Sequence, residues 1–186
     1  MKALIDACAD PKFPAEISLV ISNIADAGGL EHAQRAGIPT KVVSHKGYAS
    51  REEFDRALDA ALQDAKIEIV CLAGFMRILS DWFAERWAGR LINIHPSLLP
   101  AFKGLNVHRQ ALDAGVRIAG CTVHFVVPEL DSGPIIAQAS VPVLPSDDED
   151  ALAARILGEE HKLYPEALKL LAGKKVKLEN GKAVFT

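Results

Sequence analysis

The chain has 186 residues, 49% of them hydrophobic and 24% charged, as expected for one soluble globular domain with a substantial core. Its formal net charge of −3 gives no basic footprint for a nucleic acid partner. The three cysteines are scattered without metal-ligand spacing, and no stretch resembles a transmembrane segment or a signal peptide. We therefore expect a reduced, cytoplasmic protein with no metal and no membrane partner.

Strands and helices alternate through the first half of the chain. The pattern predicts three strands, over residues 17–21, 40–43 and 67–72. The third is nearly all apolar, as in a parallel strand covered on both faces. Gly28 and Gly29 precede a helix over residues 30–36. Ser50 and Glu53 form a capping box, which opens a helix with one apolar face: Phe54, Ala57, Leu58, Ala61 and Leu62.

The second half contains longer elements. Ser80 caps a short helix, which leads to a strand that ends at Asn93. Further elements are expected in this order: a helix fragment at 110–114, strands at 121–127 and 135–141, and a helix over 148–171. Residues 174–185 alternate around Asn180-Gly181, a strong hairpin signal. The order of elements predicts an open, mostly parallel twisted α/β sheet with helices on both faces. In such sheets, ligands bind beyond the carboxyl ends of the strands.

The segment Asn-Ile-His-Pro-Ser-Leu-Leu-Pro, at residues 93–100, carries the clearest chemical signal. Asn93 and His95 lie two residues apart, so in an extended chain they share one face, roughly 7 Å apart. Pro96 and Pro100 restrict the backbone and favour a rigid turn over further strand pairing. An amide and an imidazole held at a strand end can hydrogen-bond a carbonyl oxygen and shuttle a proton.

This octapeptide resembles the signature of the folate-dependent formyltransferases. Residues 129–136 resemble the second motif of the family, which carries its catalytic aspartate, here Asp131. Residues 73–80 resemble the folate-contacting segment of the branch that acts in purine synthesis. The resemblance extends from Met1 to about residue 171, and it implies a Rossmann-like formyltransferase fold. The sequence His-Arg-Gln-Ala-Leu at residues 108–112 also favours the purine branch.

The resemblance implies formyl transfer from the co-substrate 10-formyltetrahydrofolate to the amine of glycinamide ribonucleotide. The amine attacks the formyl carbon directly, so no covalent enzyme intermediate is needed. Asn93 is expected to donate to the oxyanion, a contact worth about 3–4 kcal/mol in other enzymes. His95 is the expected second donor and proton shuttle. Asp131 is expected to orient His95 and to hold a water for proton relay, although Ser132-Gly133-Pro134 would also suit an ordinary turn aspartate.

The resemblance also implies binding residues for both substrates. Folate contacts, mostly through the backbone, fall on two segments and Asn93: Met76, Arg77, Ile78, Leu79, Val127, Pro128, Glu129, Leu130 and Asp131. Arg51 and Arg77 match cations that pair with the glutamate carboxylates of folate, but Arg51 also suits an exposed helix start. Glu160 matches a residue of the family that contacts the ribonucleotide, although a glutamate on a solvated helix face is equally compatible with the sequence. Leu157, one helical turn earlier, stands where the family has a polar residue. His124 either faces the site or satisfies a buried carbonyl.

The start of the chain departs from the family pattern. The resemblance implies an apolar strand and a Gly/Ser-Asn turn that holds the ribonucleotide phosphate at a helix N-terminus. Residues 1–6 resemble the helix that follows this turn. We therefore expect a single domain over 1–186 without that strand and turn, exposing a ladder edge and a hydrophobic slot. Either the true start lies upstream of Met1, which we favour, or the chain is a truncated form that binds substrate weakly.

Three alternatives to the purine enzyme remain. One is a folate-binding remnant without transferase activity. The second is formyltetrahydrofolate hydrolase, which has a sequence similar to that of residues 100–104 but normally carries an N-terminal regulatory domain. The third is methionyl-tRNA formyltransferase, which normally adds a C-terminal domain and a basic surface. The long connection over residues 101–118 is expected to move over the folate site.

Overall fold

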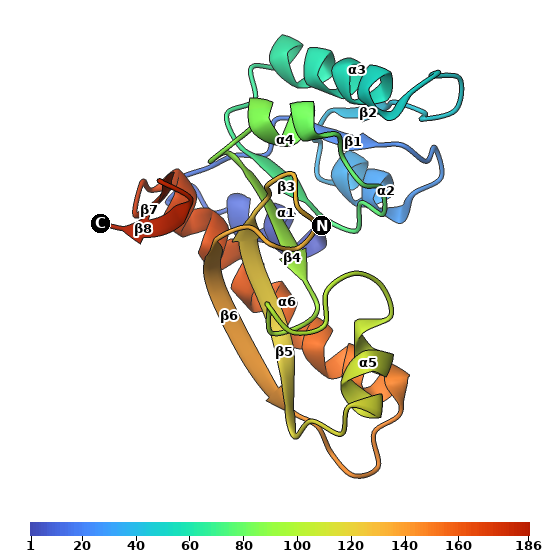
Figure 1. The fold of residues 1–186 in the computed structure, drawn as a ribbon. Coiled ribbons are helices and arrows are strands. Elements are labelled where there is room, and N and C mark those ends of the chain that lie inside the picture. Colours follow the sequence, from blue (N-terminus) through green and yellow to red (C-terminus); the bar gives the residue numbers. More distant parts are fainter.

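The computed structural model describes residues 1–186, which form six helices and eight strands (Figure 1). The helices are α1 (Lys2–Cys8), α2 (Gly28–Arg35), α3 (Arg51–Asp64), α4 (Asp81–Arg86), α5 (Val107–Asp113) and α6 (Glu149–Ala172). The strands are β1 (Val20–Ser22), β2 (Thr40–Val42), β3 (Val70–Leu72), β4 (Leu91–His95), β5 (Ile118–Phe125), β6 (Ile135–Pro142), β7 (Val176–Glu179) and β8 (Lys182–Phe185). None of the helices is long and apolar enough to span a membrane.

The α/β class and the order of the elements agree with the sequence, and several bounds differ. β1 and β3 are three residues long, shorter than predicted, because each pairs with only one neighbouring strand. β4 continues through His95, two residues past the predicted end. The capping box at α3 is confirmed: Ser50 Oγ accepts from the Glu53 N–H, while the Glu53 carboxylate accepts from the Ala49 N–H.

The strands pair in three groups. β1 and β2 are parallel and form one sheet, and the β7–β8 hairpin turns through Asn180 and Gly181, both with positive φ as a type I′ turn requires. The main sheet has the order β3-β4-β5-β6, in which β3 and β4 are parallel and β5 is antiparallel to both neighbours. Parallel pairing is therefore confined to the first half of the chain. The antiparallel register places Asn93 opposite His124, and His95 opposite Thr122.

Helices cover both faces of the strands, as predicted. α6 and α1 pack on one face, where residues such as Ile92, Val123 and Phe125 join the largest core cluster. α3 and α4 cover the other face of the β3 side, where Phe54 and Trp87 are buried with Leu91. Along β4, therefore, Ile92 points toward α6, while Leu91, Asn93 and His95 alternate to the opposite face. Figure 1 shows α6 behind β5 and β6.

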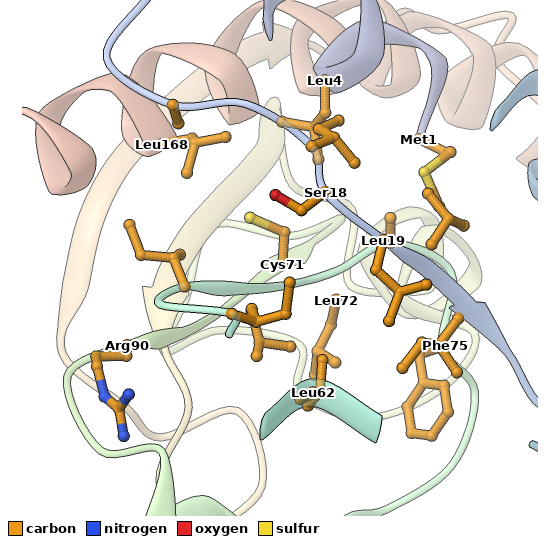
Figure 2. Close-up of a pocket in the computed structure, with 18 of the residues that line it drawn as sticks. Met1, Leu4, Ser18, Leu19, Leu62, Cys71, Leu72, Phe75, Arg90 and Leu168 are labelled. Carbon is orange, nitrogen blue, oxygen red and sulfur yellow. The ribbon is translucent and has the colours of Figure 1, made fainter. Parts of the chain in front are cut away.

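A cavity of about 1010 Å³ separates β1 from β3. Its walls include residues of both strands, Met1 at the chain start, and apolar side chains from three helices: Leu4, Leu62 and Leu168 (Figure 2). β1 pairs only with β2, and β3 pairs only with β4, so one edge of each strand has no strand partner. The exposed ladder edge and the hydrophobic slot expected from the sequence are both present.

Candidate active site

The polar residues of β4 lie on the sheet face opposite α6, beyond Leu91, the residue of this strand that packs with α3 and α4. Leu91 anchors the start of the strand in the α3–α4 core, and the same alternation presents Asn93 and His95 next to the loops that follow β4 and β5. His95 is 5% exposed and Asn93 is half-buried. The turn after His95 is tied to β5, because the hydroxyl of Thr122 donates to the Ser97 carbonyl and accepts from the Leu99 N–H.

Asp131 contacts His95, although the two residues are far apart in the sequence. Its Oδ2 lies 3.5 Å from His95 Nδ1, and its side chain is 8% exposed. The Gly104 N–H donates to the same oxygen at 2.9 Å, and Lys103 Nζ contacts the hydroxyl of neighbouring Ser132. The loop after β4 therefore contacts both Asp131 and the residue that follows it.

The position of Asp131 depends on close backbone packing. Its φ is 48°, in the left-handed region that Asp tolerates better than most residues. Gly133, two residues later, approaches β5 so closely that a Cβ there would lie 1.7 Å from the Phe125 carbonyl oxygen. Only glycine allows this approach, which brings the turn back toward the sheet. The Phe125 N–H then donates to the Pro134 carbonyl.

Both ring nitrogens of His95 face acceptors. Nε2 lies 2.9 Å from the Phe102 carbonyl oxygen, and Nδ1 faces the Asp131 carboxylate. A neutral imidazole has one N–H and one lone pair, so it would direct a lone pair at one of these oxygens. The imidazolium satisfies both. His95 therefore lies between a carbonyl oxygen and a carboxylate, so an N–H on either ring nitrogen has an acceptor.

His124 lies beside both Asn93 and Asp131. Its Nε2 is 3.4 Å from Asn93 Nδ2 and 3.9 Å from Asp131 Oδ1, and its Nδ1 is 2.9 Å from the Phe125 carbonyl oxygen. Burial lowers the pKa of His124, and the nearby His95 acts in the same direction. The Phe125 hydrogen bond and the Asp131 charge oppose that shift. Both readings of His124 from the sequence therefore hold: it faces the site and it satisfies a buried carbonyl.

Comparisons with known proteins identify the family to which this chain belongs. The family model described as formyl transferase matches residues 1–168. The chain belongs to the formyl transferase family.

Individual members of the formyl transferase family resemble the whole chain. Phosphoribosylglycinamide formyltransferase of Escherichia coli is 46% identical over 98% of this chain and 86% of its own length. The human trifunctional purine biosynthetic protein adenosine-3 is 54% identical over 98% of this chain, which spans only 18% of that protein. A crystal structure of glycinamide ribonucleotide transformylase 1 from Symbiobacterium toebii superposes with a TM-score of 0.95 at 47% identity, covering 99% of this chain and 87% of the other.

A formyltetrahydrofolate deformylase from Pseudomonas syringae shares the family fold. Its structure gives a TM-score of 0.90 at 28% identity, covering 98% of this chain and 60% of the deformylase. The fold alone therefore does not separate transfer to an amine from transfer to water.

The formyltransferase segments predicted to contact folate lie in two loops. The loop after β3 exposes Met76 and Ile78, while Leu79 packs against the α3–α4 core. The Arg77 guanidinium lies 5.7 Å from the ring centre of Phe54, and Arg51 is the first residue of α3. The loop after β5 exposes Pro128, Glu129 and Leu130 and half-buries Val127 before it reaches Asp131.

Glu160 is not brought together with the three predicted catalytic residues. It lies on α6, which packs on the sheet face opposite the side chains of Asn93 and His95. Its carboxylate is half-buried, and burial raises its pKa. One helical turn later, the Tyr164 hydroxyl reaches the carbonyls of Leu72 and Ile92.

Sequence reasoning did not find the backbone groups that complete the site. Phe102 and Gly104 contribute a carbonyl and an N–H, which leave no mark in residue type. The sequence indicated only that Gly133 belongs to a turn, and not that it packs closely against β5. The contact between Asn93 and His124 depends on the antiparallel register of β5, which the local pattern of that strand does not encode.

Proposed function

We propose that this chain transfers the formyl group of 10-formyltetrahydrofolate to the amine of glycinamide ribonucleotide, as in purine biosynthesis. The observation that carries the proposal is the contact of His95 with Asp131 beside Asn93, at the end of β4. The cluster suits this class of reaction, because the three side chains provide hydrogen-bond donors and a proton carrier, and the reaction needs no covalent nucleophile. The Escherichia coli relative is named for this reaction.

In this mechanism the substrate amine attacks the formyl carbon and the C=O electron pair moves onto oxygen. Asn93 Nδ2–H and a His95 N–H donate to that oxyanion. A proton leaves the attacking nitrogen, and another is delivered to the folate nitrogen. The tetrahedral intermediate then collapses, the C–N bond to folate breaks, and formylated ribonucleotide and tetrahydrofolate are released. Asp131 keeps the imidazolium oriented, and by the family resemblance it holds the water that relays the proton.

The loop after β4 has to shift for His95 to serve the oxyanion. In the structure the Phe102 carbonyl oxygen accepts from His95 Nε2, at 2.9 Å. The oxyanion is a stronger acceptor and replaces this carbonyl once substrate binds. This requirement agrees with the sequence-based prediction that residues 101–118 move over the folate site.

Substrate binding is proposed at the loops around this cluster. The loops at residues 76–79 and 127–131 hold the folate, and Arg51 and Arg77 pair with its glutamate carboxylates. Glu160 contacts the ribonucleotide. The chain acts as a single domain in the cytoplasm, on small molecules, and requires no metal.

Hydrolysis of 10-formyltetrahydrofolate is the second candidate, because the deformylase structure shares the fold. The same donors would then serve a water nucleophile. The complete gene product is incubated with 10-formyltetrahydrofolate, with and without glycinamide ribonucleotide, and products are identified by mass spectrometry. Formylated ribonucleotide that forms only when the amine is present supports transfer. Formate released at the same rate in both reactions would refute it.

A further inference from the structure

We propose that His124 is a positioning residue, whose Nε2 lone pair fixes the orientation of the Asn93 side-chain amide so that an N–H faces the formyl oxygen. The proposal rests on the formyl transfer proposed above. His124 is assigned no contact with substrate. It acts through Asn93, its partner on the neighbouring strand.

The hydrogen bonds of His124 determine which ring nitrogen carries the proton. Nδ1 lies 2.9 Å from the Phe125 carbonyl oxygen, which can only accept, so Nδ1 carries the hydrogen. In the neutral ring, Nε2 then has a lone pair directed away from that carbonyl. Asn93 Nδ2 lies 3.4 Å from Nε2 and donates to it. The other N–H of the same amide remains available to the substrate.

The surroundings keep His124 in the accepting form. The His124 side chain is 3% exposed, so water does not compete for Nε2. The titratable groups that face it are Asp131, with Oδ1 3.9 Å from Nε2, and His95 on β4. Burial, the largest influence, lowers the pKa of His124 and favours the neutral ring, outweighing the opposing effects of the Phe125 hydrogen bond and the Asp131 charge. The turn at Gly133 lies close to the ring, since a Cβ at this glycine would be 3.4 Å from His124 Nδ1.

An asparagine amide needs such a partner because its oxygen and nitrogen ends have nearly the same shape. Packing alone cannot distinguish the two orientations, and hydrogen bonds decide between them. Without an acceptor at Nε2, Asn93 is free to turn its Oδ1 toward the reacting carbonyl. An oxygen there repels the developing oxyanion instead of stabilising it. Loss of one oriented donor lowers kcat about 10²–10³-fold in other enzymes, and partial misorientation costs less.

Two substitutions separate orientation from simple packing. His124→Leu fills the space without an acceptor, while His124→Gln places an amide oxygen near the position of Nε2. We expect His124→Leu to lower kcat about tenfold to hundredfold, with the folate KM changed less than about threefold. His124→Gln should restore kcat to within about fivefold of the wild type. Equal losses in the two variants, each with a native circular dichroism spectrum, would overturn the proposal.

A double-mutant cycle tests whether the effect passes through Asn93. In an Asn93→Ala background no amide remains to be oriented, so adding His124→Leu should change kcat less than about twofold. The same tenfold or larger loss in both backgrounds would show that His124 acts by another route and would overturn the proposal.

Nitrogen-15 NMR of the labelled protein provides a readout independent of activity. At pH 7.5 the His124 signals should show a protonated Nδ1 and an unprotonated Nε2. A protonated Nε2 would overturn the inference even if the enzyme is fully active. Conversely, a wild-type protein with the expected tautomer but no transfer to glycinamide ribonucleotide would refute the proposed function and leave the hydrogen-bond assignment intact.

Discussion

Gly133→Ala should disable the site without touching any group that reacts. A Cβ at this position would lie 1.7 Å from the Phe125 carbonyl oxygen, whereas real Cβ contacts essentially never fall below 3.0 Å. The turn therefore has to move by about 1.3 Å, which follows from these two distances. Asp131, two residues earlier, moves with it, and its contact with His95 Nδ1 is already 3.5 Å long.

The expected magnitude follows from that displacement. Misplacing a catalytic group by about 1 Å can cost roughly 100-fold in rate. The overpacked turn should also lower the free energy of unfolding by about 1–3 kcal/mol. Activity is measured as initial rates at saturating substrate, and stability by urea denaturation followed by circular dichroism.

Gly158→Ala is the matched control. Gly158 lies within α6, and a Cβ there would meet nothing within 4 Å. This substitution should raise the free energy of unfolding by about 0.5–1 kcal/mol and leave kcat unchanged. A Gly133→Ala protein with wild-type kcat would show that the turn tolerates the displacement and that the reasoning from the Gly133 contact is wrong.

Three further predictions concern other parts of the molecule. Burial raises the pKa of Cys71 to about 12, so about one Cys71 thiol in 10⁴ is ionised at pH 8. Iodoacetamide should therefore alkylate Cys71 about 10³-fold more slowly than a free thiol, as measured by mass spectrometry. Complete alkylation at the rate of glutathione would contradict this. The hydrogen bond from Arg155 lowers the pKa of Asp147 to about 2, from 3.8, so its contribution to stability is present above pH 3.8 and is lost as the pH falls toward 2. The melting temperature of Arg155→Ala should accordingly be lower than that of the wild type at pH 5, with the gap closing near pH 2, and a gap independent of pH would exclude the ion pair as its cause. Tyr164→Phe removes a buried hydroxyl that contacts the Leu72 and Ile92 carbonyls. It should lower the free energy of unfolding, measured in urea, by about 1–2 kcal/mol. A change below about 0.3 kcal/mol would indicate that these contacts do not contribute to stability.

The elements that could be predicted from the sequence are those with a local physical cause. Ser50 and Glu53 cap α3 because a side-chain oxygen and a carboxylate satisfy free N–H groups at a helix start. Asn180 and Gly181 form the hairpin turn because both tolerate positive φ. The alternation in β4 puts Asn93 and His95 on one face for the same kind of reason.

The features that could not be predicted depend on partners distant in the sequence. The antiparallel pairing of β5 with β4 decides that His124 meets Asn93, and alternation alone is compatible with either strand direction. β1 and β3 are shorter than their apolar patterns suggested, because one edge of each has no strand partner. The hydrogen bond from Gly104 to Asp131 is donated by a backbone N–H, a group that every residue except proline has.

Asp131→Asn gives the most direct test of the central claim that the Asn93, His95 and Asp131 cluster transfers the formyl group. Asparagine has the same shape as aspartate and tolerates the positive φ of this position, so the fold and the bond from the Gly104 N–H should persist. Single-turnover formyl transfer to glycinamide ribonucleotide is measured beside the dissociation constant for folate. We predict a fall in rate of about 10²–10⁴-fold, with the dissociation constant changed less than about threefold. Transfer at the wild-type rate, or an equal loss of rate and folate affinity, would contradict the roles assigned to this cluster.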